Sequence, residues 1–470
     1  MRGYLRRGIL LDGAAYKVVG FTRPGKTLRR GMPKPTSTPR RRRPLKEADV
    51  PGLAARRAAL RLLDAVLRRG EPLETALHAA TQGLTRGSDK GLAHAIAADV
   101  LRWLPDLDAL IDTVTEQPIP PDVKSRMVLR MALVQILLLE TPPHAAISTA
   151  LPLTEGGPRR LVHGVLGSLI RAEAKLPEVP TLPADVTERW AGQWGIEMVS
   201  VAARALARRA PIDLSFADAA EAERITDMMG GTSLMPGHVR LDHDVSVPDL
   251  PGYTQGHWWV QDISASLPAR LAGVGEGRIA LDLCAAPGGK TMQLASAGWR
   301  VTALDKSAKR LERLAENLVR SGLGTQVEVA QGDALTWEPA APADLILLDA
   351  PCSATGIFRR HPDVLYRAGP RQIAEMAELQ GALLDRAAAW LKPGGMLIYA
   401  TCSLERAEGE DQIAAFLASH PGFAVQPVQT EELPAGIAPT PEGFVRTLPG
   451  TLEELGGADG FFVARLVLNA

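Results

Sequence analysis

Two of the three cysteines in this 470-residue chain stand where a thiol can do chemistry. Cys352 and Cys402 each follow a short apolar run, at 345–348 and 396–399, that we expect to be a buried strand. Residues that follow neighbouring parallel strands share the carboxyl edge of the sheet, where open α/β sheets bind their ligands. A free cysteine taken alone is more often a small apolar side chain. The shared position favours a reactive role for both thiols.

A glycine-containing turn follows the first expected strand, at 279–283, and leads into a helix. Such a turn lets backbone approach a cofactor closely. A Walker A phosphate loop would need a glycine at the position of Cys284, and the three-glycine dinucleotide fingerprint is absent as well. The turn therefore favours a nucleoside cofactor without a pyrophosphate.

Two aspartates follow the next two expected strands. Asp305 closes the run at 301–304, at about the spacing of a carboxylate that binds ribose hydroxyls, and Asp333 follows the run at 327–330, where it can contact an adenine. Either aspartate alone is better explained as a turn acid that caps the next helix. Their common position after successive strands favours S-adenosylmethionine as the cofactor.

A thiol beside a methyl donor points to one reaction in particular. The C5 carbon of cytosine is too weakly nucleophilic to attack a sulfonium methyl group, but addition of a thiolate at C6 moves electron density onto C5. An acidic group at the N3 edge would stabilise the adduct, and Asp349, close in sequence to Cys352, is the candidate. A free thiol has a pKa near ~8.5, so the nucleophile needs local activation, to which a cationic methyl donor contributes.

The elements that must position these residues divide the chain into four segments. We expect a basic, disordered tail at 1–50, an all-helical domain at 51–176, a linker with a small α+β subdomain at 177–260, and a parallel α/β domain at 261–470. Further expectations are an N-cap at Ser88, one helix at 185–209, a β-like run at 239–241 and an edge strand at 461–468.

Composition bounds the function classes. With 46% hydrophobic and 23% charged residues, the chain is not disordered throughout. Its formal net charge is zero, but residues 1–46 contain 14 Lys and Arg with a single acid, which leaves 39 basic and 52 acidic residues elsewhere. A polyanionic partner must therefore be held by local basic patches. The tail is either a nucleic-acid-binding arm or a solvated extension, and Met32 is an alternative start.

Three widely spaced cysteines offer neither a disulfide framework nor a metal knuckle, so we expect a reducing cytoplasm and no metal. The longest apolar run, at 131–139, is too short to cross a bilayer and suits a buried core helix. The N-terminus does not read as a secretory signal. We expect neither export nor a membrane partner.

The motifs resemble those of the Nop/Sun family of RNA cytosine-5 methyltransferases. The resemblance rests on segments 282–291, 349–356, 358–363 and 401–403. The helical region, with 88–90 and 129–144, is similar to the NusB-like domain of the bacterial 16S ribosomal RNA members. Together these similarities cover about 51–468. They imply a class I Rossmann-like methyltransferase domain with a mostly parallel sheet, preceded by an all-α NusB-like domain that binds RNA.

The resemblance also implies roles for individual residues. Cys402, in the Thr-Cys motif, would be the nucleophile, and Cys352 would assist breakdown of the covalent adduct and product release. With Asp349, the candidate for the N3 edge, they form the predicted catalytic set. DNA cytosine-5 enzymes use the Pro-Cys cysteine instead, so the presence of both thiols points to RNA. The implied cofactor-binding residues are Cys284, Ala285, Ala286, Pro287, Gly288, Gly289, Lys290, Asp305, Asp333 and Asp349.

The implied activity is transfer of a methyl group from S-adenosylmethionine to C5 of a cytosine in 16S ribosomal RNA or a small-subunit precursor, by a monomer. The same chemistry on transfer RNA, and a non-catalytic RNA-binding factor for ribosome assembly, are the alternatives, although a binder has no need of paired thiols. The segment at 159–167 only partly follows the helix usual in the family, which affects its RNA contact more than the catalysis.

RNA contacts are harder to place from sequence. A basic stretch after the fourth strand of the α/β domain can grip phosphates or form a solvated helix face. Trp258 and Trp259 can stack on bases, but tryptophans before a strand are more often core, and we expect core here. The basic stretch comprises Arg359, Arg360, His361, Arg367 and Arg371.

Overall fold

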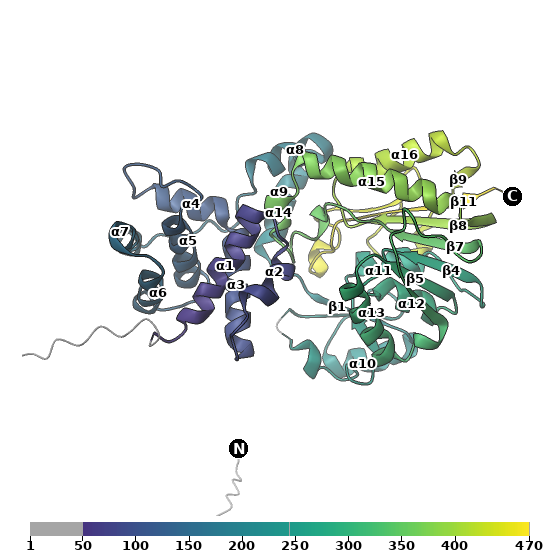
Figure 1. Ribbon diagram of the computed structural model, residues 1–470, viewed down its shortest axis with the longest axis horizontal. Helices are drawn as coiled ribbons and strands as arrows, with labels where there is room; N and C mark the ends of the chain where they lie inside the picture. The colour runs from purple at the N-terminus through teal and green to yellow at the C-terminus, as the bar shows by residue number, and fades with distance from the viewer. Residues whose placement is uncertain (1–49, 244, 470) are drawn as a thin grey trace, which may run out of the picture. The chain divides into compact units, whose positions relative to one another are not determined.

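The computed structural model describes residues 50–243 and 245–469, so the basic tail expected at 1–50 lies almost wholly outside the described residues. No helix among the described residues is long and apolar enough to span a membrane. The chain forms a helical bundle, a small antiparallel sheet and a larger, mostly parallel sheet (Figure 1). This architecture confirms the expected fold class.

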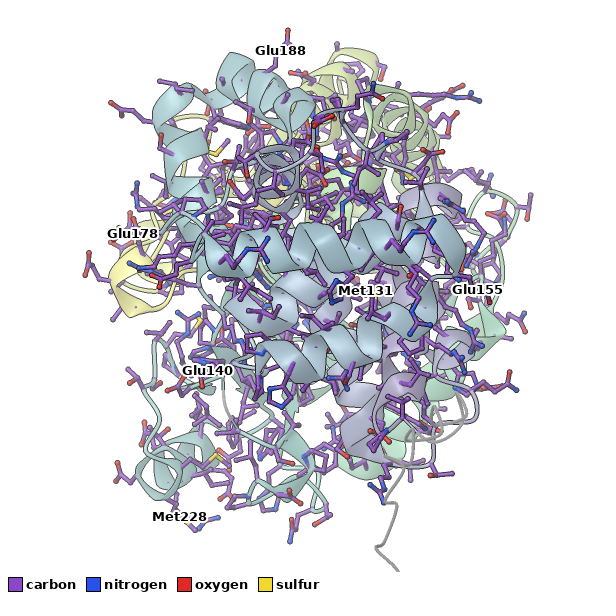
Figure 2. The ribbon with its side chains drawn as sticks, turned by 90° about the vertical axis from the view of Figure 1, so that its left-hand side faces the viewer. Met131, Glu140, Glu155, Glu178, Glu188 and Met228 are labelled. Carbon is purple, nitrogen blue, oxygen red and sulfur yellow. The ribbon has the colours of Figure 1, made fainter. Side chains whose placement is uncertain are left out.

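The N-terminal part is a helical bundle around an aliphatic core that includes Leu62, Ile96 and Leu133, all fully buried. Met131, on the central helix α5, is buried as well, and Figure 2 views the bundle from outside with Glu140 and Glu155 at its surface. The helices are α1 (Leu53–Arg69), α2 (Leu73–Ala80), α3 (Gly87–Arg102), α4 (Leu104–Asp112), α5 (Lys124–Leu137), α6 (Pro143–Ala150) and α7 (Gly156–Arg171).

Two arginines on α5 lie inside the bundle rather than on its surface. Arg126 donates to both Asp108 and Asp112 at 2.8 Å, and Arg130 makes a two-bond pair with Asp108 at 2.7 Å. A buried guanidinium is tolerated only when carboxylates pair with it. This cluster joins α5 to α4, so its two guanidinium groups are not available to bind RNA.

The middle segment contains two short helices, α8 (Ala184–Trp194) and α9 (Ile196–Ala207), where sequence analysis predicted one. The prediction is wrong at Gly195, which adopts φ 85° and ψ 160°, a conformation that side-chain-bearing residues avoid. A small antiparallel sheet follows in the order β2-β1-β3, from β1 (Ile212–Phe216), α10 (Ala219–Met229), β2 (His238–Leu241) and β3 (Trp258–Val260).

The large sheet has the order β10-β11-β8-β7-β4-β5-β6, with β9 pairing to β11. The five strands from β8 to β6 are parallel, whereas β11 runs antiparallel to β8, β9 and β10. The strands are β4 (Ile279–Leu283), β5 (Arg300–Asp305), β6 (Val327–Gln331), β7 (Ala343–Asp349), β8 (Leu391–Thr401), β9 (Phe423–Val425), β10 (Val445–Thr447) and β11 (Phe461–Leu468).

Helices cover both faces of this sheet (Figure 1). One face packs Leu345 and Ile398 against α11 and α12, and the opposite face packs Leu348 and Leu397 against α15 and α16. Burial on both faces explains why these strands read as continuous apolar runs. The helices are α11 (Ile263–Arg270), α12 (Gly289–Ser296), α13 (Ala308–Ser321), α14 (Val364–Arg367), α15 (Pro370–Ala388) and α16 (Glu410–Ser419).

Two local predictions need correction. Strand β11 is not an edge strand, because it pairs with β8 on one side and with β9 and β10 on the other. Ser88 is not an N-cap, because α3 begins one residue earlier, at Gly87, with Arg86 in the capping position and no side-chain cap. The strands expected at 279–283 and 239–241 are confirmed by β4 and β2.

Candidate active site

The turn between β4 and α12 carries the predicted cofactor residues and bends through positive φ at two positions. Cys284 has φ 63° and Gly288 has φ 104°. A Cβ on Gly288 would lie 2.9 Å from Leu314 Cγ on α13, so only glycine fits. Arg310, on α13, donates to the carbonyl of Ala286 and holds the turn from the same side.

Asp305 is the last residue of β5 and pairs with Gln331, and Asp333 lies two residues beyond β6, so both aspartates stand at the carboxyl ends of neighbouring strands. Asp305 is buried, accepts the backbone N–H of Ala286 at 3.2 Å and of Ser307 at 2.9 Å, and pairs with Arg310 at 3.1 Å. Asp333 is more exposed, and the Lys306 ammonium 2.8 Å away holds the pKa of its carboxyl below the usual range. Both carboxylates therefore also organise their own turns, the alternative left open for each.

Asp282, within β4, is fully buried beneath the turn. Its Oδ2 accepts the Thr291 hydroxyl at 2.5 Å, whereas Oδ1 has no hydrogen-bond partner among the described residues. Burial, reinforced by the nearby Asp349 carboxylate, raises the pKa of Asp282 to about 7. A buried oxygen without a partner is a candidate contact for a polar group of a ligand.

Asp349, at the end of β7, forms an ion pair with Lys290, at the start of α12, with 2.7 Å between Asp349 Oδ2 and Lys290 Nζ. The Lys290 side chain is 11% exposed and the Asp349 side chain 32%. Lys290 also lies 5.2 Å from the centre of the Phe461 ring. The pair joins the cofactor turn to the strand that leads to Cys352.

The structure brings the two predicted catalytic thiols together. Cys352 Sγ lies 3.5 Å from Cys402 Sγ, and both side chains are partly buried. Strands β7 and β8 pair in parallel up to Asp349 and Ala400, and the Gly356 N–H then donates to the Cys402 carbonyl at 2.9 Å. The two loops are thus joined beyond the ends of their strands.

Two of the three thiols have raised pKa values. The hydrogen bond with Cys402, together with burial, raises the pKa of Cys352 well above its usual range. Burial raises the pKa of Cys284 to about 12. Cys284 is therefore a poor nucleophile, in keeping with the prediction that it belongs to the turn without reacting.

Cavities lie on both sides of the turn. A cavity of about 400 Å³ is lined by Asp282, Lys290 and Asp349, and a cavity of about 140 Å³ is lined by Asp305 and Asp333. The smaller one supplies carboxylates for hydroxyl and amine donors, and the larger one supplies the partnerless Asp282 oxygen and an ion pair. These groups fit a nucleoside joined to an amino acid, which is the composition of S-adenosylmethionine.

The basic stretch predicted to grip phosphates does not form such a surface. Arg359 is 5% exposed, and it donates to Asp459 at 3.0 Å. Arg360 donates to Asp262 at 2.8 Å and to Asp459 at 3.0 Å. Both guanidinium groups are paired with buried carboxylates, so the prediction of phosphate binding is wrong for these two residues. Arg367 pairs with Asp363 in the same way.

Exposed residues at this stretch and the two tryptophans fit the simpler predictions. Arg371 is exposed and pairs with Glu375 at 2.8 Å, four residues away on the same helix, as a solvated helix face would. Trp258 and Trp259 are buried, which confirms that they belong to the core.

Glu408, which follows Cys402 by six residues, is a site residue that the sequence pattern did not indicate. Its buried carboxylate accepts hydrogen bonds from Ser353 and Ser403, the residues directly after the two cysteines. The repeated Cys-Ser pair is visible in the sequence, but its shared partner becomes evident only when the two loops come together. Gln380, on α15, donates to the same carboxylate at 3.0 Å.

Family models match two parts of the chain. The model described as 16S rRNA methyltransferase RsmB/F matches residues 271–467, and the NusB family model matches residues 53–171. A ribosomal RNA small subunit methyltransferase B of Xanthomonas campestris pv. campestris is 34% identical over 441 residues, which are 90% of this chain and 98% of the relative.

Solved structures share the fold. The crystal structure of PH0851 has a TM-score of 0.68 at 23% identity and covers 90% of this chain and 100% of its own. NSun6 from Pyrococcus horikoshii, solved with SFG, has a TM-score of 0.53 at 19% identity and covers 61% of this chain and 98% of its own. With the full-length relative, the two family models and the site geometry in agreement, the chain belongs to the RsmB/F family of 16S rRNA methyltransferases.

Proposed function

We propose that this chain methylates C5 of a cytosine in 16S ribosomal RNA through a covalent bond between Cys402 and C6 of the base. As a member of its family, the chain is an S-adenosylmethionine-dependent RNA methyltransferase. The observation that carries the covalent mechanism is the contact of Cys352 and Cys402 at 3.5 Å, at the carboxyl edge that also holds the cofactor turn. A purely RNA-binding protein has no use for this arrangement.

The two thiols have different roles in this reaction. Cys402, as thiolate, adds to C6, and the electron pair of the C5–C6 double bond moves toward C5. S-adenosylmethionine supplies the electrophilic methyl group that C5 takes up. Removal of the C5 proton by a base then restores the double bond as the Cys402–C6 bond breaks. Cys352, whose pKa is raised, remains a thiol and assists this last step.

Asp349 and Lys290 serve the Watson–Crick edge of the base. Addition at C6 increases the basicity of N3, so a carboxyl group that shares a proton with N3 stabilises the adduct. We assign this role to Asp349. Lys290 Nζ lies 2.7 Å from Asp349 Oδ2 and compensates the negative charge of this carboxylate. Because Lys290 belongs to the cofactor turn, the ion pair connects that turn to the group that shares a proton with N3.

The remaining cofactor assignments follow the two cavities. Asp305 would bind the ribose and Asp333 the adenine on one side of the turn, with Lys290 and Asp349 on the other. The turn itself, 284–290, would lie along the cofactor with its backbone.

We further propose the domain assignments and partners. The bundle at 51–176 would bind 16S ribosomal RNA or a small-subunit precursor, 177–260 would join it to the methyltransferase domain at 261–470, and the protein would act as a cytoplasmic monomer without a membrane partner. The NusB family match supports the RNA-binding bundle.

The test is transfer of labelled methyl groups to unmodified 16S and transfer RNA transcripts. The wild type should place label in 5-methylcytosine of 16S RNA, and Cys402→Ala should reduce it to background, because no thiolate can add to C6. Cys352→Ala should instead accumulate a protein–RNA adduct that survives denaturing electrophoresis.

Other outcomes would redirect the proposal. Label confined to transfer RNA would overturn the substrate assignment. Cofactor binding without label on either RNA would mean that a partly assembled subunit is the substrate, to be tested with subunits from cells that lack the gene. Absence of cofactor binding would support a non-catalytic assembly factor.

A further inference from the structure

Glu408 closes the 3₁₀ turn at Arg406–Glu408 and is fully buried. Its Oε1 accepts the Ser353 N–H at 2.8 Å and the Gln380 amide at 3.0 Å. Its Oε2 accepts the hydroxyl of Ser403 at 2.5 Å and that of Ser353. One carboxylate therefore receives four hydrogen bonds, which is about the capacity of its lone pairs.

The donors connect Glu408 to both cysteines. Ser353 directly follows Cys352, and Ser403 directly follows Cys402, while the two serine hydroxyls lie 3.2 Å apart. The backbone carbonyl of Glu408 also accepts the Tyr399 hydroxyl at 2.8 Å, which fixes the turn against β8. The carboxylate thus bridges the two catalytic loops at the residues next to their thiols.

Joining two loops through a buried carboxylate has a high desolvation cost. Within 50–243 and 245–469, no lysine, arginine or histidine forms an ion pair with Glu408, so its four hydrogen bonds all come from neutral donors. An amide or hydroxyl would join the loops at a lower desolvation cost. The charge itself therefore calls for an explanation.

The neighbouring thiol supplies that explanation. A buried negative charge near a thiol disfavours its ionised form. Glu408 is one of the groups that raise the pKa of Cys352, after the hydrogen bond to Cys402 and burial. Of two thiols in contact, one must ionise and attack, and the other must keep its proton.

We propose that Glu408 is a positioning residue that holds the two cysteine loops in contact and places a buried negative charge beside Cys352. It acts through Ser353 and Ser403 and touches neither substrate nor cofactor. The assignment of the attacking thiol to Cys402 rests on the proposed function. The distance between the thiols and the hydrogen bonds of Glu408 do not.

Two substitutions distinguish the hydrogen bonds that Glu408 makes to the two loops from its negative charge. Glu408→Gln keeps an acceptor for the Ser353 N–H, and the serine hydroxyls can reorient, but the charge is lost. Glu408→Ala removes both. Asp106→Ala is the matched control, because Asp106 is a buried carboxylate that accepts the Thr181 N–H and hydroxyl at 2.9 and 2.7 Å, between the bundle and the middle segment.

Two measurements on the full-length protein need no RNA. A short bifunctional alkylating reagent that fluoresces only when both arms have reacted reports whether Cys352 and Cys402 are in contact. Monofunctional alkylation of Cys352, mapped by mass spectrometry across pH, reports its ionisation. Cys284, whose pKa is raised to about 12 by burial, gives the background for a thiol that stays protonated.

Glu408→Gln should bridge the thiols within about twofold of the wild type, with Cys352 alkylation shifted to lower pH because the adjacent charge is gone. Glu408→Ala should lower bridging at least about tenfold and kcat about 100-fold, with KM for S-adenosylmethionine unchanged, since misplacement of a reacting group costs about this much. Asp106→Ala should lower stability without altering bridging or the Cys352 profile.

Wild-type bridging in Glu408→Ala would show that Glu408 does not hold the two loops in contact. An unshifted Cys352 profile in Glu408→Gln would reduce Glu408 to a structural link with no effect on the thiol. Where Glu408→Ala does not fold, the Ser353→Ala/Ser403→Ala double variant tests the same bridge and should lower bridging while the charge remains. Full activity of Cys402→Ala would contradict the proposed function but leave the bridging result intact, so the two failures are distinguishable.

Discussion

At the residue scale, Asp282 makes a structural hydrogen bond, but burial makes ionisation of its carboxyl group unfavourable. Its buried carboxyl group has one partner, Thr291, and its pKa is raised to about 7. The folded protein therefore holds the Asp282 proton more tightly than the unfolded chain does. A carboxyl group of this kind favours folding while it is protonated, and this contribution disappears as it ionises.

We predict that the free energy of unfolding contributed by Asp282 falls as the pH rises from about 4 to about 7, by on the order of 4 kcal/mol. Asp282→Asn cannot ionise, so its stability relative to the wild type should improve over this range. Urea unfolding of both proteins at several pH values measures the difference.

Asp344→Asn is the matched control, on β7. Although burial opposes it, the hydrogen bonds from Lys392 and the Ile279 N–H hold the pKa of Asp344 below its usual value. The wild type should therefore gain on this variant as the pH rises toward about 4, the opposite sign, and the difference should stay constant above that pH. A difference curve for Asp282→Asn that is flat or runs with that of Asp344→Asn would contradict the raised pKa.

At the element scale, the Cys352 loop depends on close contact between two backbone segments. Gly356 donates its N–H to the Cys402 carbonyl and accepts the Gly460 N–H, each at 2.9 Å, just before β11 begins. A Cβ on Gly356 would lie 2.0 Å from the Gly460 carbonyl oxygen. Only two glycines allow the loop and the start of β11 to approach this closely.

We predict that Gly356→Ala destabilises the protein by about 1–3 kcal/mol, because rigid backbone must move to make room for the methyl group. It should also lower kcat, since the displaced loop carries Cys352. Thermal unfolding and methyl transfer at saturating substrates measure the two effects.

Gly369→Ala serves as the comparison for this change. An added Cβ there meets nothing within 4 Å, and φ is −88°. Because Gly369 is the N-cap of α15, where alanine is less favourable than glycine, the substitution should cost no more than about 1 kcal/mol and should leave kcat unchanged. Equal effects of the two substitutions would show that steric contact at Gly460 is not the cause.

At the scale of the whole molecule, the bundle and the methyltransferase domain meet at the segment that follows the Cys352 loop. Tyr366 donates its hydroxyl to the Leu101 carbonyl at 2.8 Å, and Asp363 accepts the Leu73 N–H at 3.2 Å. Arg102, at the end of α3, donates to the Arg359 carbonyl at 3.2 Å and to the Leu206 carbonyl. Three helices are thus anchored beside the catalytic loop.

We predict that Arg102→Met lowers stability by roughly 2–3 kcal/mol, since two buried carbonyl groups lose a charged donor. It should also weaken the coupling between bundle and sheet, so that unfolding monitored by far-UV circular dichroism and by tryptophan fluorescence no longer coincides. Arg204→Met, which breaks only an exposed pair with Glu453, should change stability by no more than about 0.5 kcal/mol. Coincident transitions in Arg102→Met would show that Arg102 does not carry this coupling.

The amino-acid sequence by itself determined the parallel strands, the cofactor turn and the approach of the two thiols. Runs such as 279–283 are buried on both faces, so their apolar residues identify them locally, and the ends of neighbouring parallel strands share an edge. From that alone, Cys352 and Cys402 could be placed together, and their 3.5 Å contact agrees.

Only the tertiary structure decided which charges are free and where the last strand lies. Arg359 and Arg360 look like a phosphate grip in sequence, but their partners, Asp262 and Asp459, are about 100 residues away in each direction. In the same way β11 enters the sheet between β8 and β10, and Glu408 finds Ser353 55 residues earlier. Local sequence patterns indicate which residues are buried and where turns occur. The pairing of buried charges depends instead on contacts that exist only once the chain has folded.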